Sequence, residues 1–197
     1  MGSQVSGPQF TSSNELVLPK DYREWVYVSS GIGMTYGPAA SAGGGNQMFE
    51  NVFVNPQAYR EFQKTGKWPT RTLFILEIRS SSNHGSIVSG GSFQTKLVRW
   101  EGSLKDEKQY PEKWTYFDFG PPSDGVVKAK PQPVQSCFAC HAANAAVDNT
   151  FVQFYPTLLE TATKMKTLRS DLSVNSPAGG KLSRTARRGL TNHPVMR

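Results

Sequence analysis

Two cysteines and a histidine stand close together in the segment Cys137-Phe138-Ala139-Cys140-His141. The spacing C-x-x-C-H is the attachment signal for a c-type haem. Each thiol can add to one of the two vinyl groups of a haem, and the histidine that follows can supply the proximal nitrogen to the iron. Cys137 and Cys140 are the only cysteines of the chain, so no thiol is left for a disulfide elsewhere. The segment therefore predicts covalently bound haem c with His141 as iron ligand.

The same cysteine spacing occurs in other kinds of site, and a pair of buried, inert cysteines is the plainest alternative. A thioredoxin-like redox dithiol lies near a βαβ pattern, which this sequence lacks. A zinc site needs two further ligands, and the other histidines, His84 and His193, stand in Gly/Ser-rich and tail-like surroundings. The haem interpretation is favoured, and the residues after His141 strengthen it.

The net charge of +7 comes from the end of the chain. From Lys164 onward there are eight Lys/Arg residues and one acid, Asp171, whereas residues 1–163 hold 14 basic and 14 acidic residues. A neutral body offers no basic groove for nucleic acid, so we expect no nucleic-acid partner. A short basic tail is usually solvated, although a specific anionic partner for it is an alternative.

No run of about 18 apolar residues occurs, so we expect no membrane span. Met1 to Phe10 has neither a basic start nor an apolar run, and it does not resemble a secretory signal peptide. Covalent haem attachment takes place outside the bacterial cytoplasmic membrane. We therefore expect a periplasmic protein from which a signal segment has been removed.

Five segments have the composition and alternation of β-strands. The segment Arg71–Arg79 is the strongest, and its centre is apolar on both faces, which predicts a central position in a sheet. In Met48–Val54, Phe49, Asn51 and Phe53 share one face, whereas Glu50 lies on the other. The remaining expected strands are Glu24–Ser29, Ser92–Trp100 and Lys113–Phe119.

Three helices are expected between and after these strands. The first has Asn55 as N-cap, Pro56 at its first position and Gly66 at its end. The haem motif is expected on the first turns of a helix that continues through the alanine-rich segment Ala142–Val147. A third helix should run from Pro156 to about Leu168, with Met165 on its packing stripe. The glycine-rich segment Ser30–Asn46 predicts a long loop.

This order of elements predicts an α+β fold, with a mostly antiparallel β-sheet and a c-type haem carried by the C-terminal helices. We expect a disordered segment over residues 1–13, one domain over residues 14–168 and a basic disordered tail over residues 169–197. Small electron-transfer cytochromes are instead mainly helical and place a methionine on the sixth position of the iron. Met165 is expected in the core and not on the iron.

Several segments make the sequence similar to the cytochrome P-460 family over roughly Leu18–Leu168. The most specific segment joins the haem motif to an F-x-x-F-Y-P run. The matching segments are LPKDYREWVYV (Leu18–Val28), VFVNPQAYREFQKTGKWP (Val52–Pro69), EGSLKD (Glu101–Asp106), KWTYFDF (Lys113–Phe119) and CFACHAANAAVDNTFVQFYPTL (Cys137–Leu158).

The resemblance implies a five-coordinate haem iron bound by His141, a homodimer in the periplasm, and small nitrogen oxides as ligands. Enzymes of the family oxidise hydroxylamine to nitrous oxide or nitrite, and they carry a further covalent link from a strand lysine to the haem. Relatives called cytochromes c′-β share the fold, lack that link, and bind nitric oxide and carbon monoxide.

Two positions depart from the enzymes' pattern. The cross-linking lysine matches Leu76, which has no nucleophilic atom, and Lys96 on a neighbouring strand is the nearby substitute to consider. A distal arginine of the family matches Glu50, which would accept protons instead of donating them. Glu50 facing solvent or pairing with a base is the alternative.

Three functions follow from these expectations. The first is a mono-haem cytochrome c whose open distal site, lined by Phe74, Leu76 and Ile78, binds a small ligand such as nitric oxide. The second is an oxidoreductase acting on hydroxylamine, with Glu50 as the candidate catalytic residue. The third is an electron carrier serving a redox partner protein, which requires a sixth strong iron ligand that the sequence does not reveal.

Overall fold

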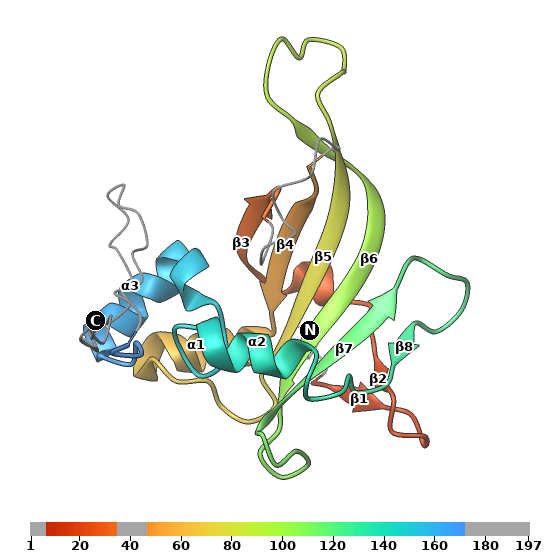
Figure 1. Ribbon diagram of the computed structural model, residues 1–197. Helices are drawn as coiled ribbons and strands as arrows, with labels where there is room; N and C mark the ends of the chain where they lie inside the picture. Colours follow the sequence, from red (N-terminus) through yellow and green to blue (C-terminus); the bar gives the residue numbers. More distant parts are fainter. Residues whose placement is uncertain (1–6, 35–46, 172–197) are drawn as a thin grey trace, which may run out of the picture.

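The structure is a computed structural model that describes residues 7–34 and 47–171. Its centre is an antiparallel sheet in which the strands follow one another in chain order (Figure 1). Because β5 is the third of five, the expected central position of Arg71–Arg79 is confirmed. The strands are β3 (Val26–Ile32), β4 (Phe49–Val54), β5 (Leu73–Ser82), β6 (Phe93–Lys105) and β7 (Trp114–Gly120).

Three α-helices lie to one side of this sheet (Figure 1), as the α+β prediction requires. A second, small antiparallel sheet lies toward its other side, with β2 between β1 and β8. Among the described residues no helix is long and apolar enough to cross a membrane. The helices are α1 (Pro56–Thr65), α2 (Cys137–Asn144) and α3 (Pro156–Met165), and the short strands are β1 (Gln9–Phe10), β2 (Leu16–Val17) and β8 (Lys128–Ala129).

Each face of the five-stranded sheet has its own apolar core, because alternate side chains of a strand point to opposite faces. On the helix side, Phe62 of α1 stacks on Trp68 with ring centroids 4.0 Å apart, and Leu158 of α3 is fully buried beside them. The other face packs under the segment that leads from β2 to β3, with Leu73 and Ile75 of β5 fully buried. The helix-side face is the one that carries the candidate site.

Several boundaries differ from the expectations. Residues 9–10 form β1 and pair with β2, so the ordered chain begins before Asn14. Arg169 donates hydrogen bonds from its backbone to Ala146 and from its side chain to Ala142, so it belongs to the domain and not to a tail. Helix α2 ends at Asn144; Ala145 is extended, and both Ala145 and Ala146 are buried.

The expected cap of α1 is correct in position and wrong in mechanism. Pro56 begins the helix, and Gly66 ends it with a φ of 67°, a conformation that glycine adopts without strain. The Asn55 side chain makes no capping bond and instead accepts a hydrogen bond from the Leu73 backbone at 2.9 Å. Asn55 thus ties the start of α1 to β5.

One expectation concerns the loop after β3, and another concerns the placement of Met165. Ser30–Ile32 belongs to β3, Met34 and Gln47 are described, and the rest of the expected loop, residues 35–46, lies outside the described residues. Met165 is 37% exposed, so its placement in the core was wrong. A Cβ added to Gly66 would lie 2.7 Å from the Cβ of Met165, so the end of α3 packs closely against the end of α1.

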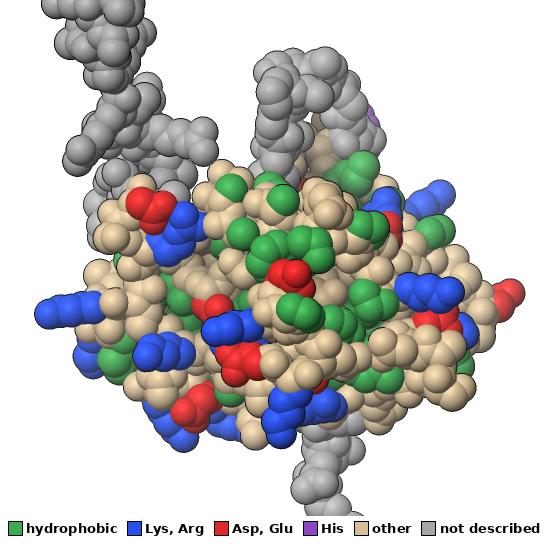
Figure 2. Space-filling model, turned by 60° about the horizontal axis from the view of Figure 1, so that its bottom comes forward, with side chains coloured by type: hydrophobic (Ala, Val, Ile, Leu, Met, Phe, Trp, Pro, Cys, Tyr) green, Lys and Arg blue, Asp and Glu red, His purple; other side chains and the backbone are tan. Residues whose placement is uncertain are grey.

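Charged side chains on the described surface are mixed in sign. Figure 2 shows Lys/Arg and Asp/Glu side chains interspersed over one face of the molecule. This distribution agrees with the equal numbers of basic and acidic residues before Lys164.

Candidate functional site

Helix α2 brings the three residues of the haem motif to one side. Cys137 begins the helix, and Cys140 and His141 follow at positions i+3 and i+4, which share a helix face. All three side chains line a cavity between α2 and the sheet, and both thiols are free. The helix therefore presents two nucleophilic sulfurs and an imidazole to one space.

The imidazole of His141 is held in one orientation. Its Nδ1 lies 2.8 Å from the carbonyl oxygen of Asn149, and because a carbonyl only accepts, Nδ1 carries the hydrogen. The ring lies between Tyr116 and Phe151, with centroid distances of 4.3 and 4.4 Å. Burial lowers the pKa of His141, although the hydrogen bond to Asn149 opposes this, and the ring stays neutral. Nε2 thus keeps its lone pair for a metal.

The cavity has a volume of about 490 Å³, within the range of sites that hold small molecules and cofactors. Its floor is the helix-side face of the sheet, where directly opposed residues form rows across the strands. The row nearest His141 contains Phe74, Ser103 and Tyr116, and the next contains Val52, Leu76, Glu101 and Asp118.

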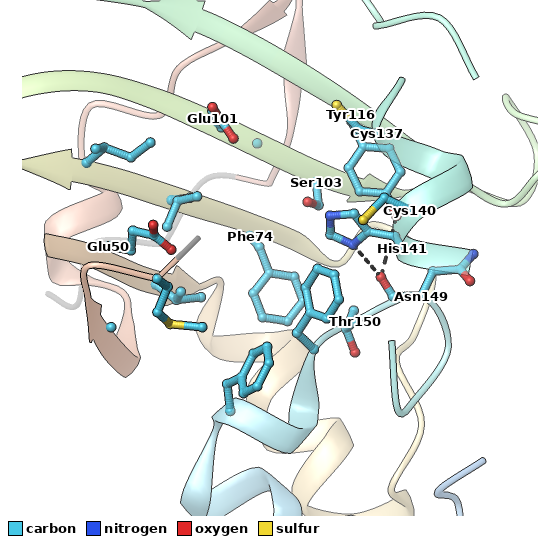
Figure 3. A pocket seen from close by; sticks show the side chains of 18 of the residues that line it. Glu50, Phe74, Glu101, Ser103, Tyr116, Cys137, Cys140, His141, Asn149 and Thr150 are labelled. Carbon is cyan, nitrogen blue, oxygen red and sulfur yellow. Dashed lines mark hydrogen bonds between the residues drawn. The ribbon is translucent and has the colours of Figure 1, made fainter. Parts of the chain in front are cut away.

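The far end of the cavity carries acidic groups. Figure 3 shows Glu50 and Glu101 at the end opposite His141. Burial raises the pKa of Glu101, and the negative charge of Asp118 raises it further. The guanidinium of Arg99, 3.7 Å away, acts in the opposite direction. Burial also acts to raise the pKa of Asp118, but its hydrogen bonds from Arg99 and the Gly120 backbone bring it below the ordinary value. Glu101 is therefore the more readily protonated of the two.

The structure places the other predicted residues as follows. Glu50, Phe74, Leu76 and Ile78 all line the cavity, whereas Lys96 is exposed and does not. No lysine is found among the described residues that line it. Leu76 lies directly opposite Val52 and Glu101 on the neighbouring strands. Their roles as cofactor or ligand contacts stay predictions.

Sequence reasoning missed Glu101 and Met34. The strand was expected to end at Trp100, but β6 continues through Glu101 and Gly102 to Lys105. A Cβ on Gly102 would lie 3.0 Å from the Phe119 ring. Met34 lines the cavity, and its sulfur packs so closely against Gly31 that a side chain at position 31 would not fit. Alternation on an extended β6 would have indicated Glu101, whereas nothing in the sequence singled out Met34.

These residues fit a covalently attached haem. Two thiols and an imidazole face a mainly apolar cavity, and they are the residue types that a c-type attachment uses: two cysteines for the macrocycle and one histidine for the iron. Cys137 and Cys140 would hold the macrocycle, and Nε2 of His141 would bind its iron. A structural metal site has less support, since no group of three or more His, Cys, Asp or Glu that could hold an ion occurs within residues 7–34 and 47–171.

Comparison with known families agrees with this chemistry. The model of the family described as Cytochrome P460 matches residues 19–152, which is more than half of the chain and includes the haem motif. A search of curated proteins found no match.

Proposed function

Since the chain belongs to the cytochrome P460 family, we propose that it is a mono-haem cytochrome c with an open distal site for a small neutral ligand such as nitric oxide. The observation that carries the proposal is the cavity itself. His141 stands at one end, and beyond it the floor presents the apolar side chains of Val52, Phe74 and Leu76. An iron held by His141 would offer its other side to a diatomic ligand.

The residues of the chain have distinct tasks in this proposal. Cys137 and Cys140 anchor the cofactor, and the hydrogen bond of His141 to Asn149 directs Nε2 at the iron. Phe74 and Leu76 exclude water from the ligand side, which favours neutral diatomics over water or hydroxide. Met34 offers the one thioether among the described cavity-lining residues. Its sulfur is packed against Gly31, so we assign it to the wall.

Hydroxylamine oxidation is the second candidate, and Glu101 favours it. The reaction releases protons, and a carboxylate in the cavity whose pKa is raised by burial accepts them more readily than an ordinary carboxylate. Glu50 lines the same end of the cavity. The lack of a lysine opposite Glu101, where Leu76 stands, weighs against this reaction in a family whose enzymes carry the lysine link.

The test is an optical and magnetic-resonance spectrum of the purified ferric protein, followed by titration of the ferrous protein with nitric oxide. We expect a high-spin ferric spectrum at neutral pH and stoichiometric binding of nitric oxide. Hydroxylamine with an added oxidant should be turned over slowly or not at all.

A low-spin spectrum with a methionine-to-iron charge-transfer band would contradict the open site and favour an electron carrier. Met34→Leu would then remove the band, whereas Met165→Leu, at a position outside the cavity, is the matched control. Rapid hydroxylamine turnover would favour the second candidate.

The cellular setting belongs to the same proposal. We propose a periplasmic homodimer, because haem attachment occurs in that compartment and the family resemblance implies a dimer. A redox partner protein would reduce the haem before it binds nitric oxide. Size-exclusion chromatography with light scattering tests the oligomeric state.

A further inference from the structure

The segment Ala145–Thr150, called here the proximal loop, carries the carbonyl that His141 contacts. Val147 and Thr150 exchange backbone hydrogen bonds of 3.3 and 2.8 Å, which closes a two-residue turn between them. The two central residues, Asp148 and Asn149, have φ values of 43° and 59°. Asp and Asn adopt this left-handed conformation more readily than other non-glycine residues, but two in succession still cost free energy without glycine, so the turn gains from support by its surroundings.

That support comes from Lys105, the last residue of β6. Its side chain is 9% exposed, and its ammonium donates to Asp148 Oδ2 at 2.6 Å and to the Trp68 carbonyl at 2.8 Å. The second carboxylate oxygen of Asp148 accepts from Trp114 Nε1 at 3.2 Å. Glu107 lies 3.6 Å from the same ammonium. A buried ammonium is tolerated only with such partners.

The turn is held from its other side as well. Trp68 Nε1 donates to Thr150 Oγ1 at 2.9 Å, and that hydroxyl donates to the Val147 carbonyl at 2.6 Å. Lys105 and Trp114 of the sheet therefore hold Asp148, and Trp68, from the segment between α1 and β5, holds Thr150 on the other side of Asn149. The Asn149 carbonyl has little freedom to leave His141 Nδ1.

We propose that Lys105 is a positioning residue for the iron ligand His141, acting through Asp148 and the carbonyl of Asn149. The inference rests on the proposed haem function. A hydrogen bond accepted from Nδ1 increases the electron donation of Nε2, and partners of this kind tune the properties of the bound metal. Loss of the ion pair frees the turn, weakens that hydrogen bond and weakens donation to the iron.

Two variants of the haem-loaded full chain test the proposal. Lys105→Met removes the ammonium and keeps the length of the side chain, whereas Asp148→Asn removes the charge and keeps an oxygen for Trp114. In each, we expect the iron–histidine stretching band of the ferrous protein to move to lower wavenumber and the reduction potential to rise. The double variant should show no further shift, because both changes break one interaction.

Lys128→Met is the matched control. It removes an ion pair of nearly the same length, 2.7 Å to Glu15, from a lysine on β8 that makes none of the proximal-loop contacts. We expect its stretching band and reduction potential to equal those of the unmodified protein.

If both variants melt at lower temperature and keep the unmodified band and potential, Lys105 only stabilises the fold and the proposal is wrong. A variant that keeps its far-ultraviolet circular dichroism and loses the histidine-ligated haem supports the proposal. Failure of the proposed function is a separate outcome, since it would appear as absence of covalent haem in the unmodified protein.

Discussion

At the scale of single residues, Glu101 combines a place in the cavity with a carboxyl whose proton is held more tightly than usual. Burial is the main cause of its raised pKa. A carboxyl that ionises near a haem stabilises the ferric charge, so the reduction potential should fall as pH rises above about 4.3, the ordinary pKa of Glu. The slope should stay below about 59 mV per pH unit, the limit for one proton per electron.

Glu101→Gln should flatten this pH dependence, and potentiometric titration from pH 4 to 8 measures it. Glu61→Gln is the control, because Glu61 on α1 has a similar exposed fraction, 44% against 43%, and does not line the cavity. A pH dependence that survives in Glu101→Gln would assign the titration to another group.

Leu76 decides whether the macrocycle can be linked to the sheet. The unmodified protein should show an ordinary c-type spectrum, without the far-red-shifted ferrous Soret band of the hydroxylamine-oxidising enzymes. In Leu76→Lys the amine would stand directly opposite Glu101, and opposed Cβ atoms lie about 5 Å apart. We expect this variant to gain part of the enzyme-like absorption.

Ile78→Lys is the matched control, since residue 78 lies on the same strand face one row further along the cavity. Peptide mapping of both variants by mass spectrometry locates any link. Haem joined to Lys96 in the unmodified protein would contradict the account.

At the scale of the elements, Glu77 connects the sheet to the segment before β3. Its carboxylate is buried and accepts hydrogen bonds from Tyr22, Arg23, Asn51 and Arg79. Burial by itself would raise the pKa of Glu77, but these bonds prevail and lower it to about 2. Because the folded pKa is depressed, the stabilisation is complete above about pH 4.5 and is lost as pH falls toward 2.

Glu77→Gln should therefore lower the free energy of unfolding by about 3 kcal/mol at pH 7 and reduce the acid sensitivity between pH 4.5 and 2. Urea denaturation at several pH values measures both effects. Glu24→Gln changes an exposed residue in the same short helix as Tyr22 and Arg23, and it should alter neither the free energy of unfolding nor its acid sensitivity. Equal stability of Glu77→Gln and the unmodified protein at pH 7 would contradict the assignment.

Arg169 is part of the folded domain. Its hydrogen bonds to the backbone of Ala142 and Ala146 join the end of the domain to the segment that carries the haem motif. A chain ending at Asp171 should keep its thermal midpoint, because the sequence beyond it has no apolar stripe. A chain ending at Leu168 should lose about 1–3 kcal/mol, since these carbonyls lose their partner. Differential scanning calorimetry of both chains tests the boundary.

Element types were largely predictable, whereas the composition of the cavity was not. The continuous apolar centre of Arg71–Arg79 and the Pro56 and Gly66 signals of α1 depend on local sequence, and they located these elements. The row that joins Leu76, Glu101 and Asp118 depends on strand register and on a bulge between Trp100 and Glu101. Such long-range pairing leaves no local signal, and the strand expected over Ser92–Trp100 stopped one residue before Glu101.

At the scale of the whole molecule, both faces of the sheet carry an apolar core, and one of them also forms the site. One face packs against the N-terminal segment, while the other packs against the helices and presents the cavity to α2. The haem motif and the proximal loop follow each other in the chain, whereas the cavity floor comes from the distant strands β4 to β7, which meet them only in the folded protein. The central claim is that this arrangement holds a haem through two thioether bonds.

Acid–acetone extraction of the purified protein tests that claim most directly, with the mass of the extracted polypeptide as its quantitative measure. We predict that the colour stays with the polypeptide, that the mass increases by one haem, and that replacing both Cys137 and Cys140 by serine releases the colour. Colour that moves into the organic layer from the unmodified protein, with a polypeptide of unaltered mass, would contradict the account.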